Sequence, residues 1–433
     1  MVSRIAALLA LAVVVLAGCG RQQSAPPKED KIIRIVRNLG GREGFKKHWE
    51  LWKKTFEDAN PGWTMELIDL GDNDAAGYYK TRIATDDLPE IVQTWALVKF
   101  LVDGGYVQPF PDRYFETFGV KRPASYKGKW YTSQSGLQIQ GVAVNKNMWA
   151  DIGVTEPPAT WDEFIAGLRK LKAKGYQPLV YGGREWSAYW PLMCAMSMDL
   201  YEHQPDASKP SWTKRRDAGE IKFASDPTMK LIMKNLVALL DEFTGKGVLS
   251  DGYADEGRQF YGGKAATWIM GCWIGGELEP NKADIDIAYW PLPSMTGRPP
   301  AFMTNDRSQN GWAISSKVKG EKLEKCAAVF DAFLDTPVYQ IFLNGEVQFG
   351  EASKVPVTGP KSDWPPAQRL FDDMKANLDR YGTIPGWYLG TDDLPPQALN
   401  WPRVMQEILS GNKDVDKLLQ ILDDEWDRAR KGE

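Results

Sequence analysis

Histidine and cysteine are scarce in this sequence, which holds two histidines and four cysteines among 433 residues. His48 stands beside the tryptophans of an expected core helix and His203 stands in a polar stretch, so no Ser/His/Asp or Cys/His catalytic set is indicated. The cysteines form no CxxC pair or Cys/His cluster, and no glycine-rich nucleotide-binding motif follows an expected strand. We therefore expect neither a metal site nor a cofactor.

The cysteines after residue 19 are an odd set of three. Cys326 falls among the apolar positions of an expected helix and is predicted to be a small buried hydrophobe. A disulfide between Cys194 and Cys272 stays open, because the sequence does not set the distance between them.

An excess of positive charge is also missing, since 53 lysines and arginines stand against 57 aspartates and glutamates. The formal net charge is −4 and no basic stripe occurs, which argues against nucleic acid as a partner. The acidic runs at residues 69–74 and 251–256 lack the full ligand spacing of a calcium loop and are expected to be solvated turns. One enzymatic alternative stays open, a secreted carbohydrate-active hydrolase with a carboxylate pair, because such a pair is defined only in space.

Long hydrophobic runs are absent except at the start of the chain, where a basic start precedes an apolar run at residues 5–16. A membrane-spanning helix needs about 20 apolar residues, so this run is typical of a signal-peptide core. It ends in LAGC at residues 16–19, which resembles a bacterial lipobox. The resemblance implies a lipoprotein signal peptide at residues 1–18 and lipidation of Cys19; the alternative is an ordinary signal peptide with an incidental cysteine. Residues 19–30 would be a flexible tether, and we expect an exported protein of the cell envelope, anchored to the membrane on its periplasmic or extracellular face.

The rest of the chain, about 400 residues, is longer than one hydrophobic core usually supports, which predicts two lobes. Aromatic residues make up 12% of the sequence, with 18 Trp, 16 Tyr and 16 Phe. An aromatic excess outside the cores fits a flat, partly apolar ligand such as a sugar ring.

The first expected helix follows a strand at residues 32–36 and carries aromatic residues at spacings of four, three and four. This spacing places them on one helix face and predicts that they are buried: Phe45, Trp49, Trp52 and Phe56. A second strand is expected at residues 63–70, and the order strand, helix, strand is typical of an α/β lobe with a partly parallel sheet.

Two later segments receive contrasting predictions. Residues 201–225 are polar and are expected to form a loop. Residues 227–243 are expected to form an amphipathic helix, in which three leucines are predicted to be buried: Leu231, Leu236 and Leu239.

The stretch at residues 141–183 combines a strand, a double proline and a helix that begins with a capping box of Thr160 and Glu163 and ends at Gly175. Its motifs resemble, in order, the central signature of the carbohydrate-binding group of ABC-transporter solute-binding proteins (maltose-binding-protein-like, family 1): NK at 145–146, PP at 157–158, TWDEF at 160–164 and GYQPL at 175–179. Val144 departs from the pattern, because that family usually has tyrosine there. A second match is QFYGGKAATWIMGCW at residues 259–273.

The resemblance implies an α/β, two-lobed periplasmic-binding-protein-like fold (type II), with a ligand cleft between lobes that are joined by hinge strands. The expected boundaries are residues 31–138 and 300–340 for lobe 1, residues 141–295 and 350–433 for lobe 2, and hinges near 132–141, 290–300 and 340–350.

The implied function is that of a monomeric binding protein, not an enzyme. Such a protein captures a sugar or oligosaccharide by aromatic stacking and hydroxyl hydrogen bonding and delivers it to the transmembrane subunits of an ABC permease. Related two-lobed proteins bind peptides, polyols or glycerol phosphates, so the residues leave the ligand class open.

Aromatic residues in loops at expected strand and helix ends are the first group of predicted ligand contacts: Trp273, Trp186, Tyr189, Trp190, Trp95 and Trp387. Trp273 lies on the turn beyond a buried strand, and Trp95 follows a strand at its carboxyl end. Residues 186–190 hold three aromatics in five positions, which is not a core period; the alternative is a hydrophobic staple onto the next helix.

Short polar or cationic side chains in two turns are the second group: Asn38, Arg42, Asp306 and Asn310. The turn at residues 38–43 follows the first strand, at the edge where α/β sheets present their ligands. Each residue has an alternative, which is capping or solvation for Arg42 and turn chemistry for Asp306 and Asn310.

Overall fold

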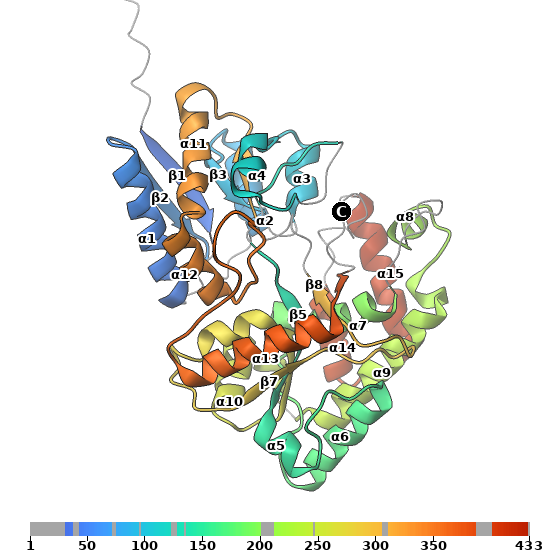
Figure 1. Ribbon diagram of the computed structural model, residues 1–433. Coiled ribbons are helices and arrows are strands. Elements are labelled where there is room, and N and C mark those ends of the chain that lie inside the picture. Colours follow the sequence, from blue (N-terminus) through green and yellow to red (C-terminus); the bar gives the residue numbers. More distant parts are fainter. Residues whose placement is uncertain are drawn as a thin grey trace, which may run out of the picture. The chain divides into compact units, whose positions relative to one another are not determined.

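A computed structural model describes residues 31–37, 43–71, 75–94, 97–122, 128–133, 136–200, 212–245, 247–304, 311–386 and 401–431. The helices and strands of this description lie in the compact unit Ile32–Glu433 (Figure 1). Two five-stranded sheets organise this unit, and each carries its own set of helices.

The first sheet has the strand order β2-β1-β3-β9-β4. Its strands are β1 (Ile32–Arg37), β2 (Thr64–Asp69), β3 (Ile91–Gln93), β4 (Val107–Gln108) and β9 (Trp312–Ser315). β1 is parallel to β2 and to β3, whereas β9 is antiparallel to both of its neighbours. A strand from beyond residue 310 therefore completes a sheet that begins at the start of the described chain.

The helices of this part are α1 (Glu43–Ala59), α2 (Ala75–Ala84), α3 (Val98–Asp103), α4 (Asp112–Phe118), α11 (Gly320–Phe333) and α12 (Thr336–Glu346). α1 packs on α11 and α12, and its predicted aromatic face is buried: Phe45, Trp49, Trp52 and Phe56. The prediction of a core at these positions is confirmed. Trp52 also donates from Nε1 to the Val329 carbonyl at 2.7 Å, which fixes α1 against α11.

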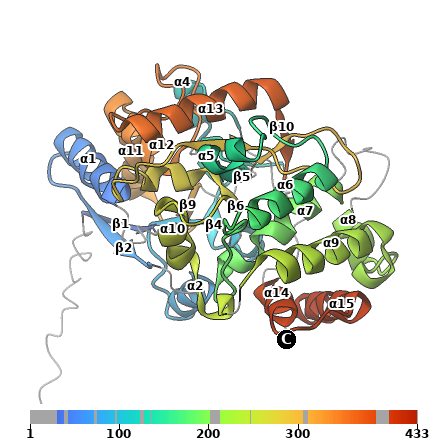
Figure 2. The same cartoon turned by 90° about the horizontal axis from the view of Figure 1, so that it is seen from below.

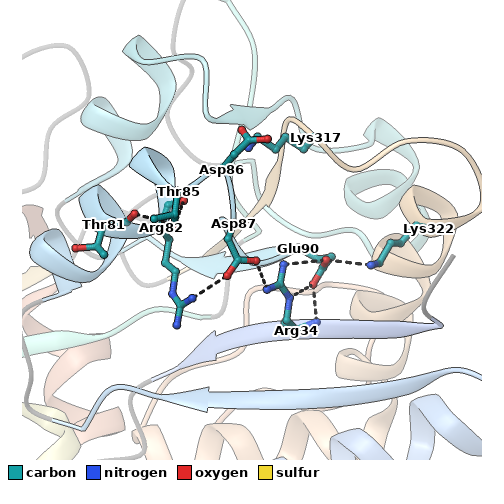
Figure 3. A network of polar contacts seen from close by, with 9 residues as sticks. All are labelled: Arg34, Thr81, Arg82, Thr85, Asp86, Asp87, Glu90, Lys317 and Lys322. Carbon is teal, nitrogen blue, oxygen red and sulfur yellow. Dashed lines mark hydrogen bonds and ion pairs between the residues drawn. The ribbon is translucent and has the colours of Figure 1, made fainter. Parts of the chain in front are cut away.

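A polar network ties β1 to the turn before β3 and to α11 (Figure 3). Arg34 donates from Nε to Glu90 Oε2 at 3.0 Å and from Nη1 to Asp87 Oδ1 at 2.6 Å. Lys322 Nζ donates to Glu90 Oε1, also at 3.0 Å. Burial raises the pKa of Glu90, but the hydrogen bonds from Arg34 and Lys322 outweigh burial and hold that pKa below its ordinary value.

The second sheet has the order β10-β8-β5-β6, and β7 pairs with β5. Its strands are β5 (Ile139–Asn145), β6 (Thr267–Gly271), β7 (Ile287–Trp290), β8 (Phe302–Thr304) and β10 (Thr383–Pro385). β5 is buried along its whole length and is antiparallel to β6, β7 and β8. It is the central strand of this part of the molecule.

The helices of the second part are α5 (Lys146–Asp151), α6 (Trp161–Ala173), α7 (Trp190–Asp199), α8 (Trp212–Asp217), α9 (Pro227–Phe243), α10 (Tyr253–Tyr261), α13 (Pro365–Tyr381), α14 (Trp401–Leu409) and α15 (Val415–Lys431). Short 3₁₀ turns are η2 (Trp186–Tyr189), η3 (Phe223–Ser225), η4 (Val248–Ser250) and η5 (Cys272–Glu277). α13 packs on β7, and Figure 2 shows α14 and α15 beside α9.

The predicted capping box of α6 is confirmed. Thr160 Oγ1 accepts from the Glu163 backbone N–H, and Glu163 Oε2 accepts from the Thr160 backbone N–H, both at 3.2 Å. Gly175 follows the helix with a φ of +87°, a conformation that glycine adopts without strain.

Two predictions about the middle of the chain are wrong. Leu236 and Leu239 of α9 are fully buried, but Leu231 is 36% exposed, because α9 turns other positions toward α7 and α15. The polar stretch expected to be a loop contains α8, where the buried Trp212 donates from Nε1 to Asp226 Oδ2 at 3.0 Å. The buried tryptophan thus anchors α8 to the start of α9.

Cysteine packing agrees with the prediction for Cys326, which is buried as a free thiol. Cys194 and Cys272 are likewise buried free thiols, so the structure contains no disulfide between them. Among the described residues no single helix is long and apolar enough to cross a membrane; α11 and α12, bent by 71°, pass that test only as a pair.

Candidate ligand-binding site

Four of the predicted aromatic residues meet in space. Trp186 and Tyr189 lie on η2, Trp190 begins α7, and Trp273 lies on η5 just after β6. The ring centroids of Trp190 and Trp273 are 5.2 Å apart. The ring centroid of Trp186 lies 5.7 Å from that of Trp190 and 6.2 Å from that of Trp273. Tyr189 lies 6.1 Å from Trp190. Segments far apart in the sequence therefore contribute to one group of rings.

A fifth ring, Tyr253, completes the group and was not predicted. It is the first residue of α10 and lies 5.1 Å from Trp186 at an interplanar angle of 35°. It lies in the acidic run at residues 251–256, where α10 begins and Glu256 is buried, so the expectation of a solvated turn there is wrong. We call Trp186, Tyr189, Trp190, Tyr253 and Trp273 the aromatic cluster.

Exposure separates the cluster from the cores. Trp186, Tyr189, Tyr253 and Trp273 are half-buried and pack on the core of the second sheet, whereas Trp190 is only 7% exposed. The buried Nε1 of Trp190 has no hydrogen-bond partner among the described residues. The half-buried rings and the buried N–H donor of Trp190 together offer a ligand apolar faces and one polar group at the same place.

Gly271 explains how Trp273 reaches this place. β6 is buried throughout and ends at Gly271. A Cβ atom at Gly271 would lie 2.0 Å from the indole of Trp273, so the ring occupies the space that any other residue would fill. The Gly-x-Trp spacing is thus a packing requirement as well as a motif.

Two side-chain hydrogen bonds, with Tyr181 and with Glu256, hold η2 in place. Tyr181 Oη donates to the Ala188 carbonyl at 2.5 Å, and Ser187 Oγ donates to Glu256 Oε1 at 2.9 Å. Glu256 Oε2 accepts from Trp268 Nε1 at 2.7 Å. Burial raises the pKa of Glu256 to about 7, although hydrogen bonds from Ser187, Trp268 and the Gly182 backbone act in the opposite direction.

The other predicted contacts lie outside the described residues: Asn38, Arg42, Trp95, Asp306, Asn310 and Trp387. The lipidation residue Cys19 also lies outside them. Four strands end next to these positions, namely β1 at Arg37, β3 at Gln93, β8 at Thr304 and β10 at Pro385. These contacts stay predictions.

The end of β1 carries a buried polar cluster with a structural role. Arg37 is 1% exposed; its Nη1 contacts His48 Nδ1, and its Nη2 lies 3.6 Å from Glu346 Oε1. Burial, and then the charge of Arg37, hold the pKa of His48 well below its ordinary value. The imidazole packs 5.2 Å from the ring of Phe342 and is fully buried, so it belongs to the core of α1 and α12.

A cavity of about 330 Å³ lies elsewhere, between α1, α12, η5 and α13. Its lining includes Gly44, Gly276 and Gly345 and one aromatic residue, Phe371. The members of the aromatic cluster do not line it. The cluster, with its half-exposed rings, is therefore the better candidate for a ligand with flat apolar faces.

Comparison with known families decides the class of protein. The family described as bacterial extracellular solute-binding protein matches residues 42–341. The chain belongs to this family. Members of this family are extracellular solute-binding proteins, which agrees with the expected export of this chain.

This solute-binding protein resembles two curated relatives at low identity. It is 22% identical over 299 residues to the "Multiple sugar-binding protein" of Streptococcus mutans, covering 66% of this chain and 68% of the relative. It is 22% identical over 431 residues to the "Melibiose/raffinose/stachyose-binding protein MelE" of Bacillus subtilis, covering 90% and 93%.

Solved structures agree on the fold of this solute-binding protein. A "Chitin oligosaccharide binding protein" matches with a TM-score of 0.75 and 21% identity over 93% of this chain and 99% of that chain. "SBP RafE in complex with raffinose" matches with a TM-score of 0.70 and 18% identity over 92% and 99%. The predicted two-lobed α/β solute-binding-protein fold is confirmed.

Proposed function

We propose that this solute-binding protein captures a sugar or oligosaccharide on the aromatic cluster and delivers it to an ABC permease. One observation carries the proposal: half-buried rings from η2, α10 and η5 gather at the end of β6, where Gly271 makes room for Trp273. The relatives are named as binding proteins for melibiose, raffinose and stachyose and for chitin oligosaccharides, which supports a sugar as the ligand class.

Binding would follow from ring chemistry. The indole faces of Trp186 and Trp273 stack on the C–H faces of a pyranose, and the Trp190 N–H donates to a hydroxyl or ring oxygen. Polar side chains predicted from the sequence, such as Arg42 and Asp306, would pair with the remaining hydroxyls. A sugar that leaves one of these groups buried and unpaired would bind more weakly, which gives selectivity.

The lobes would correspond to the two sheets. On this proposal β8 at residues 302–304 belongs to lobe 2, so the boundary expected at residue 300 moves to the segment between β8 and β9. The hinges expected near residues 132–141 and 340–350 are kept, whereas the hinge expected near 290–300 moves with this boundary. A sugar that contacts both lobes would favour their closed arrangement, which the permease would recognise.

Catalysis is not part of the proposal. Glu256 has the raised pKa of a general acid, yet it is 1% exposed and both its carboxyl oxygens accept hydrogen bonds from the protein. It therefore offers no oxygen to a glycosidic bond. Incubation with an oligosaccharide panel should return uncleaved sugars, and cleaved products would favour the hydrolase instead.

The sugar itself is best found by a thermal-shift screen over mono- and oligosaccharides, with polyols and peptides as the other arms. Ligand at about 100 times its dissociation constant stabilises the folded state by about 2.7 kcal/mol. A shift with sugars alone supports the proposal, and a shift with peptides alone would overturn it. We further propose that the protein acts as a monomer, anchored through lipidated Cys19.

A further inference from the structure

Glu256 lies directly behind the aromatic cluster and is almost completely buried. It stands on α10, three residues after Tyr253, with 1% of its surface exposed. Its two oxygens accept from Ser187 Oγ and Trp268 Nε1, and the Gly182 backbone N–H adds a further hydrogen bond. A Cβ atom at Gly182 would lie 2.6 Å from Glu256 Oε1, so glycine there permits the close approach.

The donors to this carboxyl group come from the elements that carry the rings. Ser187 lies on η2 between Trp186 and Tyr189, and Trp268 lies on β6, which leads to Trp273. Trp268 also packs 5.4 Å from Tyr253 on α10. One carboxyl group thus joins η2, β6 and α10 beneath the cluster.

The charged and titratable groups around Glu256 do not neutralise it. On the segments that carry Glu256 and its hydrogen-bond partners, these groups are Tyr181 before η2, Arg184 and Glu185 at its start, Asp251 before α10, and Tyr253, Asp255, Arg258 and Tyr261 on α10. The guanidinium of Arg184 lies 3.8 Å from Glu185 and 3.7 Å from Asp255. No cation forms an ion pair with Glu256 among the described residues, and the charge of Glu185 is repulsive.

We infer that Glu256 is a positioning residue: its buried carboxyl group holds η2, β6 and α10 together, and a change in its protonation state shifts the aromatic cluster. The inference rests on the proposed function, since the cluster is the proposed sugar platform. An ionised carboxylate accepts from all its donors, whereas a protonated one has an O–H that must itself find an acceptor. Ser187 then has to accept from Glu256 instead of donating to it, which changes how η2 is held on α10. The hydrogen bond from the Tyr253 backbone N–H to Glu185 Oε1, at 2.5 Å, remains as a second link between η2 and α10.

The sign of the pH effect follows. The ordinary pKa of this glutamate is 4.5 and burial raises it to about 7, so the carboxylate ionises within the neutral range. If sugar binding selects the ionised form and lowers this pKa by one unit, affinity falls about tenfold as pH drops from well above to well below both values.

The test uses Glu256→Gln, which has nearly the same shape but cannot ionise, and Glu242→Gln as a matched surface control on α9. Fluorotryptophan labelling gives a readout without sugar, in which the fluorine resonance of Trp186, assigned with Trp186→Phe, is followed from about pH 5 to pH 8.5. Calorimetry over the same range gives the affinity for the sugar found in the screen.

We expect the Trp186 resonance and the sugar affinity to titrate near pH 7 in the wild type and in Glu242→Gln, and to be flat in Glu256→Gln. The same titration in a His203→Gln background is a further control, because it removes one of the two histidines of the chain. Identical titrations in wild type and Glu256→Gln would overturn the inference. If no sugar binds but the resonance still titrates only with Glu256 present, the sugar proposal fails and the positioning role is supported.

Ser187→Ala provides a second variant that keeps the carboxyl group. Removing a donor to Glu256 should move the midpoint of the Trp186 titration to higher pH, because the ionised form loses a hydrogen bond. An unchanged midpoint in a folded Ser187→Ala variant would contradict the link between η2 and α10.

Discussion

A side chain at Gly271 would place its first carbon 2.0 Å from the indole of Trp273, so the strand end and the ring share one space. Gly271 has a φ of −81°, which any residue adopts, and the requirement for glycine is therefore steric. This relationship links the end of β6 to the orientation of the ring that we assign to the ligand.

Gly271→Ala is expected to displace Trp273 from the cluster. Overpacking at this position should cost about 1–3 kcal/mol of unfolding free energy, and sugar affinity should fall with it. Urea unfolding and calorimetry measure the two effects. Gly245→Ala is the matched control, because no heavy atom lies within 4 Å of a Cβ at Gly245. Wild-type affinity in Gly271→Ala would show that the ring position does not matter for binding.

The Arg34 network should matter for stability and not for binding. Glu90→Gln weakens the hydrogen bonds from Arg34 and Lys322 at a side chain that is 9% exposed, and it should cost about 3 kcal/mol of unfolding free energy at pH 7. The folded pKa of Glu90 lies below 4.5, so this stabilisation is present above that pH and is lost as pH falls through the folded pKa.

Urea unfolding of wild type and Glu90→Gln at several pH values checks this dependence. Asp86→Asn is the control within the same network (Figure 3), because Asp86 pairs with Lys317 but its side chain is 88% exposed, and it should change stability by less than about 1 kcal/mol. A stability difference for Glu90→Gln that stays constant down to acid pH would contradict the assignment.

Glu256 should show the opposite pH dependence of stability. Its folded pKa of about 7 lies above the ordinary value of 4.5, so its contribution is fully present below pH 4.5 and is lost as pH rises through 7. Wild type should therefore lose about 3 kcal/mol relative to Glu256→Gln between acid and mildly alkaline pH. Chemical unfolding across this range measures the difference, and a difference that does not change with pH would argue that Glu256 stays ionised or neutral throughout.

Anchoring can be tested apart from binding. Cys19→Ser removes the thiol that the lipobox resemblance assigns to lipidation, so the protein should move from the membrane fraction to the soluble fraction of the expression host. The soluble variant should keep its sugar affinity, since the cluster lies far along the chain. If the Cys19→Ser protein still associates with the membrane, lipidation of Cys19 is contradicted and the leader is an ordinary signal peptide with an incidental cysteine.

Local patterns predicted the parts of the fold that depend on neighbouring residues. The cap of Thr160 and Glu163 and the buried face of Trp49 and Trp52 follow from spacing alone. The prediction for Leu231 was wrong because its exposure depends on which faces of α9 pack on α7 and α15. The helical period alone does not determine which faces these are.

The site was only partly predictable for the same physical reason. Trp186, Trp190 and Trp273 could be named from their loops, and they do meet. Tyr253 joins them through a tertiary contact, and nothing in an acidic run signals it. Glu256 looks like a surface glutamate in the sequence, and its role becomes visible only when Ser187 and Trp268 are seen to converge on it.

The sugar-binding role of the aromatic cluster is tested most directly by calorimetric titration of Trp273→Ala with the sugar identified in the screen. The control is Trp364→Ala, which removes another half-buried indole, 5.3 Å from Lys282 and outside the cluster. We predict that Trp273→Ala weakens binding by about 1–3 kcal/mol while its thermal midpoint stays near wild type, and that Trp364→Ala binds normally. Unchanged sugar affinity in a folded Trp273→Ala protein would contradict the assignment of the cluster as the binding site.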